Sequence, residues 1–239
     1  MDTFQQKVRD YVEKKKPKLY ILTPCYGSMC YVNYMLSLIE TIKVCNKFGI
    51  EIQPDFCRND SLVPRARNNL IARAMNDPKM THMMFIDADI IWDPIDVIKL
   101  VISNQLLVGG LYPLKHFNWD RIKDENVIKQ WKENRDKSNY IKNISDETLI
   151  QNKLLRYNFN QVENTNTLKV SSNLTEVRHL ATGFMMIRRE TIDCMQQAFP
   201  STKYIDDIGF LKGTENDHAF ALFDCGVEVG HYFSEDWLF

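Results

Sequence analysis

The stretch THMMFIDADIIWDP, residues 81–94, decides the fold and raises the question of function. Its apolar run, MMFI, has the length and apolar density of a strand buried in a parallel sheet. The Asp-Pro pair that closes the stretch is typical of a helix start, with an N-cap and a proline at the first helical position. Asp87 and Asp89 therefore follow a strand's carboxyl end, the edge at which open α/β sheets bind ligands.

These two aspartates are separated by one small residue. Two carboxylates at that position, both facing solvent or a ligand, suit a hard divalent cation, which prefers oxygen ligands. The alternative is that both belong to a helix cap or a solvated loop. Their place after a buried strand favours a ligand site.

Composition excludes some partners. A chain of 239 residues fits one large domain or two small ones, and 44% hydrophobic residues is enough for a sizeable core. Thirty basic and thirty-one acidic side chains leave a formal charge of -1. This balance gives no electrostatic case for binding nucleic acid or an anionic membrane.

Cysteine spacing and hydropathy indicate the cellular compartment in which the protein resides. The six cysteines include no C-x-x-C pair, so neither a zinc site nor a disulfide framework is expected. The N-terminal residues 1–18 carry charges throughout, and no later segment reaches the length of a membrane span. We therefore expect a soluble, cytoplasmic protein with reduced thiols and no membrane span.

Strand and helix patterns alternate through the first half of the chain. Residues 18–24 form a short apolar strand, after which Val32, Leu36, Ile39 and Ile42 recur at helical spacing. The two patterns predict one β-loop-α unit.

The alternation continues to residue 113. A second strand at 49–56 precedes a helix that Ser61 caps and Pro64 begins. After the strand quoted first come a helix at about 94–103 and a fourth strand at 105–113, which breaks at two glycines. Strands that alternate with helices predict a parallel, doubly wound α/β sheet.

The pattern changes in the second half. Residues 115–173 are polar and charged, with weak helical signals and no strand of comparable strength. Long excursions of this kind are lids, binding loops or disordered segments. Regular structure resumes at 176–199 with a strand, a glycine turn and a helix, and a serine and two acids near the end of 220–239 open a further helix.

The chain resembles the GT-A nucleotide-sugar glycosyltransferases, especially a group found in bacteria, phages and large DNA viruses. The resemblance covers roughly half the chain and rests on six motifs in the expected order: LTPCYG, SLVPRARNNLIARAM, THMMFIDADI, GGLYPLK, ATGFMMIRRE and FALFDCGVEVGHYFSED. A D-x-D triplet alone occurs by chance in many proteins, whereas six motifs in register make the resemblance specific.

The resemblance implies one GT-A (Rossmann-like) domain over 1–239, with a mainly parallel central sheet and a long polar insertion. Residues 18–113 would form the nucleotide-sugar-binding half, 114–174 an insertion or lid, and 175–239 the acceptor half. If the protein is viral, its location would be the host cytoplasm. The sequence leaves the oligomeric state open, with a homodimer as one expectation.

The resemblance also implies transfer of a hexose from a UDP-sugar, with glucose as a guess, to an acceptor hydroxyl on a glycan or protein. Mn²⁺ or Mg²⁺ would link the donor diphosphate to Asp87 and Asp89, with Ala88 between them in the donor site. A cation there neutralises the charge that develops on the departing diphosphate. Asp89 is the expected direct ligand, and Asp87 would share the cation or accept from the ribose hydroxyls.

Further donor-binding residues follow from the matching motifs. Thr23, Pro24 and Tyr26 stand where similar enzymes grip the uracil and ribose, and Tyr26 could stack on the base or be a surface residue in a turn. Gly183 would allow close approach of a sugar ring.

The second motif supplies two candidate arginines on the first turns of its helix. Arg65 and Arg67 could pair with a phosphate or a sugar hydroxyl, because a guanidinium is a planar fork of donors. We favour Arg65 over Arg67, and the alternative for both is a solvated place on the first turns of a helix. Asn68 and Asn69 are further hydrogen-bonding candidates at the same edge.

The last motif supplies the expected catalytic acids. By resemblance to inverting enzymes, Asp236 is the general base that deprotonates the acceptor, and Glu235 receives sugar hydroxyls, or the two roles are exchanged. Both acids could instead stabilise a helix N-terminus. Related chains continue to a histidine that completes the metal shell, so either this chain is truncated at Phe239 or His231 or His218 substitutes.

Two other functions remain open at this stage. One is a nucleotide-sugar or carbohydrate-binding protein of the same fold with impaired catalysis. The other, a metal-dependent phosphohydrolase, is less favoured because no further cluster of acids or histidines offers a second metal site.

Overall fold

The computed structural model describes residues 3–120, 129, 154–157, 159–161, 174–198 and 231–233. The chain divides into two compact units. The larger comprises Met1–Leu111 and Phe159–Phe239, and the smaller is Tyr112–Asn158. Much of the predicted insertion at 114–174 and nearly all of 199–239 lie outside the described residues.

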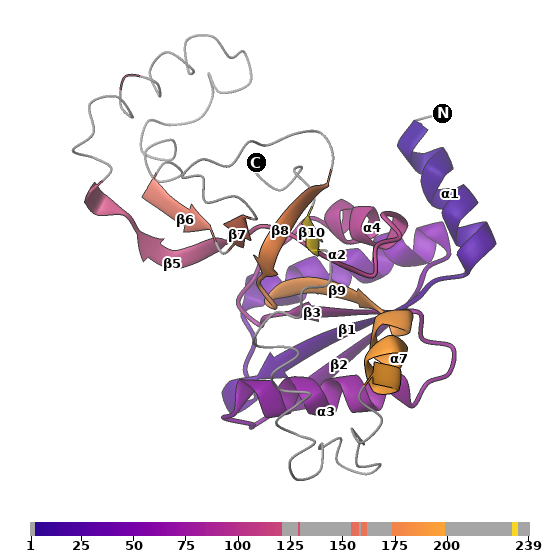
Figure 1. Cartoon of the computed structure of the whole chain (residues 1–239), viewed down its shortest axis with the longest axis horizontal. Coiled ribbons are helices and arrows are strands. Elements are labelled where there is room, and N and C mark those ends of the chain that lie inside the picture. The colour runs from indigo at the N-terminus through magenta and orange to yellow at the C-terminus, as the bar shows by residue number, and fades with distance from the viewer. Residues whose placement is uncertain are drawn as a thin grey trace. The chain divides into compact units, whose positions relative to one another are not determined.

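An eight-stranded mixed sheet forms the centre of the larger unit, in the order β2-β1-β3-β9-β4-β10-β8-β7 (Figure 1). β1 is parallel to both β2 and β3, whereas β9 is antiparallel to β3 and β4. The strands are β1 (Lys18–Cys25), β2 (Glu51–Arg58), β3 (His82–Ile86), β4 (Leu107–Gly109), β7 (Phe159–Gln161), β8 (Thr175–Leu180), β9 (Phe184–Arg188) and β10 (His231–Phe233). The Rossmann-like α/β class is compatible with this sheet, and the expected parallel pairing holds for β2, β1 and β3.

Helices cover both faces of this sheet (Figure 1). The helices are α1 (Thr3–Lys15), α2 (Val32–Phe48), α3 (Val63–Met75), α4 (Pro94–Ile102) and α7 (Arg189–Ala198). α1, α2 and α4 lie on one face, and α3 and α7 lie on the other. The chain leaves β1 towards β2 through α2 and returns through α3 to β3, on the other side of β1. This reversal places a topological switch point between β1 and β3.

The core between the sheet and the helices α3 and α7 is apolar. Phe85 and Leu22, neighbours on β3 and β1, pack there with Leu70 and Ile71 of α3 and Ile192 of α7. Each of these side chains is at most 1% exposed. Burial of one such side chain contributes about 1.5–3 kcal/mol, so this layer holds α3 against the end of β3.

Helix starts follow local side-chain chemistry. The side chain of Asp93 accepts a hydrogen bond from Ile95 N at 2.8 Å, which confirms the predicted cap of α4. The predicted cap of α3 by Ser61 is wrong, because the N-cap is Leu62 and no side chain caps it. Instead Asp60 Oδ1 accepts from Leu62 N at 3.0 Å, which closes a turn just before the helix.

The helix α2 turns its apolar stripe outward. Val32, Leu36 and Ile39 are 74%, 57% and 43% exposed. The buried face carries Tyr34, Ser37, Leu38, Thr41 and Cys45. The helical spacing therefore predicted the helix correctly. The apolar stripe of Val32, Leu36 and Ile39, however, does not face the sheet.

Trp92 explains why α2 buries hydroxyl groups. Its backbone N donates to Ser37 Oγ at 3.2 Å, and its indole Nε1 donates to Thr41 Oγ1 at 2.8 Å. A buried indole N–H requires an acceptor, which a wholly apolar helix face would not supply. These two hydrogen bonds hold the loop after β3 against α2.

The segment 176–199 forms two strands where one was expected. β8 and β9 flank the glycine turn, and β4 and β10 separate them in the sheet. The close packing of β4 on β9 requires a glycine, because a Cβ on Gly109 would lie 2.6 Å from Phe184 O.

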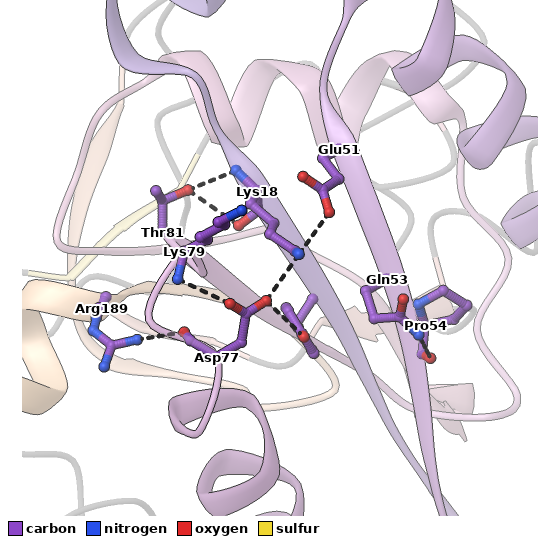
Figure 2. Close-up of polar contacts among 9 residues, drawn as sticks. Lys18, Glu51, Gln53, Pro54, Asp77, Lys79, Thr81 and Arg189 are labelled. Carbon is purple, nitrogen blue, oxygen red and sulfur yellow. Dashed lines mark hydrogen bonds and ion pairs between the residues drawn. The ribbon is translucent and has the colours of Figure 1, made fainter.

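A polar cluster joins several elements at the opposite, amino end of the parallel strands (Figure 2). Lys18 Nζ lies 2.5 Å from Glu51 Oε1 and 2.9 Å from Asp77 Oδ2. Arg189 of α7 donates from Nη1 to the backbone oxygen of Asp77 at 2.8 Å. The hydrogen bond from Lys18 lowers the pKa of Asp77 to about 2.

The smaller unit contains a short antiparallel pair. β5 (Pro113–Phe117) pairs with β6 (Leu155–Tyr157), and Asn118 N donates to Leu154 O at 2.8 Å. The sequence did not indicate these strands, because they are short and their register shifts.

Candidate functional site

Backbone hydrogen bonds gather three loops at the carboxyl ends of β1, β2 and β3. Tyr31 N donates to Ala88 O at 2.9 Å, and Asn59 N donates to Cys25 O at 3.1 Å. Asp87 N donates to Gly183 O at 2.9 Å. The D-x-D triplet is therefore tied both to the loop after β1 and to the turn before β9, at the switch point of the sheet.

Asp87 is paired with an arginine. Arg67 Nη2 lies 3.0 Å from Asp87 Oδ1, with the two side chains 11% and 36% exposed. Phe85 and Asp87 are two residues apart along an extended chain, so both point to the face that α3 covers. The guanidinium carbon of Arg67 lies 5.8 Å from the centroid of the Phe85 ring.

Asp89 lies beyond the strand in a different environment. Ile90 N donates to Asp87 O at 3.1 Å, which closes a turn that carries Asp89 into an exposed position. The two carboxylates of the triplet therefore differ: Asp87 is held by α3, and Asp89 is accessible to solvent.

The donor set of this pair fits a hard cation. Within the described residues, no group of three or more His, Cys, Asp and Glu side chains could hold a metal ion. Asp87 and Asp89 supply only carboxylate oxygens, and Mg²⁺ is commonly held by one or two carboxylates with phosphate oxygens and water as its other ligands.

The structure reverses the order of preference that the sequence suggested for Arg65 and Arg67 of α3. Arg65 is engaged by Asp60, with Nε 2.9 Å from Oδ2 and Nη2 2.7 Å from Oδ1. This bidentate contact lowers the pKa of Asp60. Arg67 is the arginine that reaches the D-x-D triplet.

A sequence signal for Arg67 was available. Leu70, Ile71 and Ala74 stand three, four and seven residues after it, so all four share one helix face. An arginine on the apolar face of a helix lies against the sheet, where it needs a carboxylate partner.

One of the three predicted contacts at the end of β1 and in the turn after it is accessible. Tyr26 is 73% exposed at the start of the short helix η1 (Tyr26–Ser28). Thr23 is fully buried, and its hydroxyl shares a hydrogen bond with the hydroxyl of Tyr34. Pro24 is half-buried within β1. The expected side-chain contact from Thr23 is therefore not available at the surface, whereas Tyr26 is accessible for stacking.

The remaining predicted residues divide into two groups. Asn68 and Asn69 are 4% and 7% exposed, so both lie beneath the surface. Gly183 is buried and contributes its backbone oxygen to Asp87. Glu235 and Asp236 lie outside the described residues, so their expected roles stay predictions.

None of the helices formed by the described residues is long and apolar enough to cross a membrane. No protein-family model matches the sequence, and no curated protein matches it. Among solved structures, the chain is similar to the "Crystal Structure of A197 from STIV". The match covers 91% of this chain and 81% of that chain, with 16% sequence identity and a TM-score of 0.44. We draw no argument from a similarity at this level.

Proposed function

We propose that the protein is a metal-dependent glycosyltransferase of GT-A type that moves a hexose from a UDP-sugar to an acceptor hydroxyl on a glycan or protein. The observation that carries the proposal is the position of the Asp87 and Asp89 carboxylates at the carboxyl end of β3, next to β1 at the switch point of the sheet. In open α/β sheets this is the crevice in which nucleotides bind.

The accessible groups around this point match a nucleotide diphosphate. Exposed Tyr26 offers an aromatic face for a base, and exposed Asp89 offers carboxylate oxygens. The hydrogen bond from Tyr31 N to Ala88 O holds the loops of these two residues together. A nucleotide diphosphate contains both a base and a diphosphate. A site for this ligand therefore needs the loop that offers an aromatic ring to lie beside the loop that offers a carboxylate.

Each residue would have a separate task in the transfer. Asp89 would hold the cation, which supplies positive charge for the departing diphosphate. Asp87, oriented by Arg67, would accept a hydrogen bond from the donor or share the cation. Asp236 is proposed as the general base, which takes the proton of the acceptor hydroxyl as that oxygen attacks the anomeric carbon.

Calorimetric titration of the whole chain with UDP and UDP-glucose, with Mn²⁺ and with EDTA, tests the proposal. We expect binding of both nucleotides that weakens when EDTA removes the cation. Asp89→Ala should lose the part of the affinity that Mn²⁺ supplies and keep its thermal unfolding transition. Equal UDP affinity with Mn²⁺ and with EDTA would contradict the metal assignment, and no affinity for any nucleotide sugar would contradict the function.

A second measurement separates an enzyme from a binding protein. Slow release of glucose from UDP-glucose, followed by NMR, is expected from a transferase when water replaces the acceptor. Binding without any hydrolysis or transfer would favour a nucleotide-sugar-binding protein of the same fold.

A further inference from the structure

Arg67 contacts the last two side chains on one face of the β3 segment. Its Nη2 lies 3.0 Å from Asp87 Oδ1, and its guanidinium lies over the ring of Phe85. Phe85 is fully buried, so the ring fixes the guanidinium from the core side. Asp87 is consequently held through one carboxylate oxygen.

The burial of Arg67 is costly for stability. The residue is 9% exposed, and its Nε has no hydrogen-bond partner among the residues that the structure describes. A buried donor without a partner lowers stability, and an apolar residue of similar length would fill this place without that cost. These two facts indicate that Arg67 serves the carboxylate site rather than the packing of α3.

Arg67 also changes the charge of the site. The guanidinium balances the negative charge of the Asp87 carboxylate, with which it forms an ion pair at 3.0 Å. With two carboxylates and no larger ligand group among the residues that the structure describes, a free divalent cation gains little from this site. A diphosphate would supply both the missing charge and the missing oxygen ligands.

We propose that Arg67 is a positioning residue that holds Asp87 Oδ1, leaves Oδ2 for the ligand and lowers the affinity of the site for a free divalent cation. The cation is thereby bound together with the nucleotide diphosphate rather than before it. The nucleotide part of this inference rests on the proposed function, whereas the cation part rests on the carboxylates alone.

Mn²⁺ titrations followed by electron paramagnetic resonance test the inference on the full chain, first without nucleotide and then with UDP. Arg67→Met removes the charge and keeps the length of the side chain. Arg73→Met is the matched control, because Arg73 lies on the same helix and pairs with Asp55 at 3.1 Å. Urea unfolding of each variant checks the fold.

We expect Arg67→Met to bind Mn²⁺ about tenfold more tightly than the parent in the absence of nucleotide, because a positive charge beside the cation is removed. UDP should raise the Mn²⁺ affinity of this variant by a smaller factor than it raises that of the parent, since Asp87 is no longer held. Arg67→Lys retains the charge and should keep the parent's affinity for Mn²⁺, and Arg73→Met should match the parent in both titrations. A residue that only supported the fold would instead weaken both bindings together with stability.

Unchanged or weaker Mn²⁺ binding by a folded Arg67→Met chain would overturn the inference. If that variant does not fold, Arg67→Gln decides, because glutamine also removes the charge and keeps a hydrogen-bond donor for Asp87. It should likewise bind Mn²⁺ more tightly than the parent in the absence of nucleotide, and unchanged or weaker binding would overturn the inference.

The same titrations keep the two proposals apart. A parent chain that binds Mn²⁺ through Asp89 but never binds UDP contradicts the proposed function, and the Mn²⁺ comparison still decides the role of Arg67. A parent chain that binds UDP but binds no Mn²⁺ even in the presence of UDP overturns the inference and leaves nucleotide binding standing.

Discussion

His82 is a histidine of β3 that the fold keeps neutral. Burial, assisted by the charge of Arg188, lowers its pKa from 6.5 to about 4. Its Nδ1 lies 2.8 Å from Thr81 Oγ1, and its Nε2 lies 3.4 Å from Tyr11 on α1. The unfolded chain therefore binds a proton near pH 6.5, where the native chain does not.

This difference predicts a loss of stability in mild acid. The contribution of His82 is complete above pH 6.5 and is lost as the pH falls towards about 4, by up to about 3 kcal/mol. His82→Gln should remove that part of the pH dependence in urea unfolding measured from pH 7 to 4. Tyr11→Phe is the control, because it removes a contact without exposing the ring. A His82→Gln chain with the parent's pH dependence would exclude this role.

At the scale of elements, α2 shows how far a helix pattern can be trusted. Leu36 and Leu38 are the same residue type two positions apart, yet they are 57% and 3% exposed. The helix follows from their spacing, and its orientation follows from Trp92, which needs the hydroxyls of Ser37 and Thr41.

Leu36 and Leu38 give a prediction about stability in which one residue serves as the control for the other. Leu38→Ala should lower the free energy of unfolding by about 2–5 kcal/mol, because it leaves a cavity beneath α2. Leu36→Ala should change it by no more than about 0.5 kcal/mol, because that side chain is in water. Denaturant unfolding of both variants measures the difference. The opposite order would mean that the apolar stripe faces the sheet.

For the larger unit as a whole, the cluster around Asp77 joins β1, β2, the segment before β3 and α7 (Figure 2). The pKa of Asp77 is lowered to about 2, chiefly by the hydrogen bond from Lys18. The stabilising effect of its charge is therefore present above pH 3.8 and is lost as the pH falls through about 2.

Asp77→Asn should accordingly lower the urea midpoint at pH 7, and the gap to the parent should close as the pH approaches 2. Glu40→Gln is the control, because among the described residues Glu40 pairs with Lys43 in an exposed ion pair. This substitution should leave the midpoint unchanged at both pH values. A gap between Asp77→Asn and the parent that stays constant down to pH 2 would show that the carboxylate charge is not what holds this cluster.

Part of the candidate site could be read from local sequence. The run before Asp87 is a buried strand, Asp93 caps the following helix, and the aspartate pair lies at the strand's carboxyl end as expected. These features depend on residues within a few positions of one another, so the printed order of residues contains the information needed.

The contacts within the site could not be read in this way. Arg65 and Arg67 are near neighbours on α3, but Asp60 captures the first and Asp87, twenty residues further along, captures the second. Thr23 ends a predicted strand next to the site, yet it is buried against Tyr34 of α2. Each outcome depends on which segment packs beside the residue.

The sequence by itself determined the alternation of strands and helices in the first half, the Asp93 cap of α4, and the place of Asp87 and Asp89 at the end of β3. Hydrophobic periodicity and hydrogen bonds between near neighbours are sufficient for these features. Only the tertiary structure decided that β9 enters antiparallel between β3 and β4, that α2 faces its stripe outward, and that Arg67 rather than Arg65 contacts Asp87. These features depend on contacts between segments far apart in the chain, where burial and the pairing of buried charges outweigh local preference.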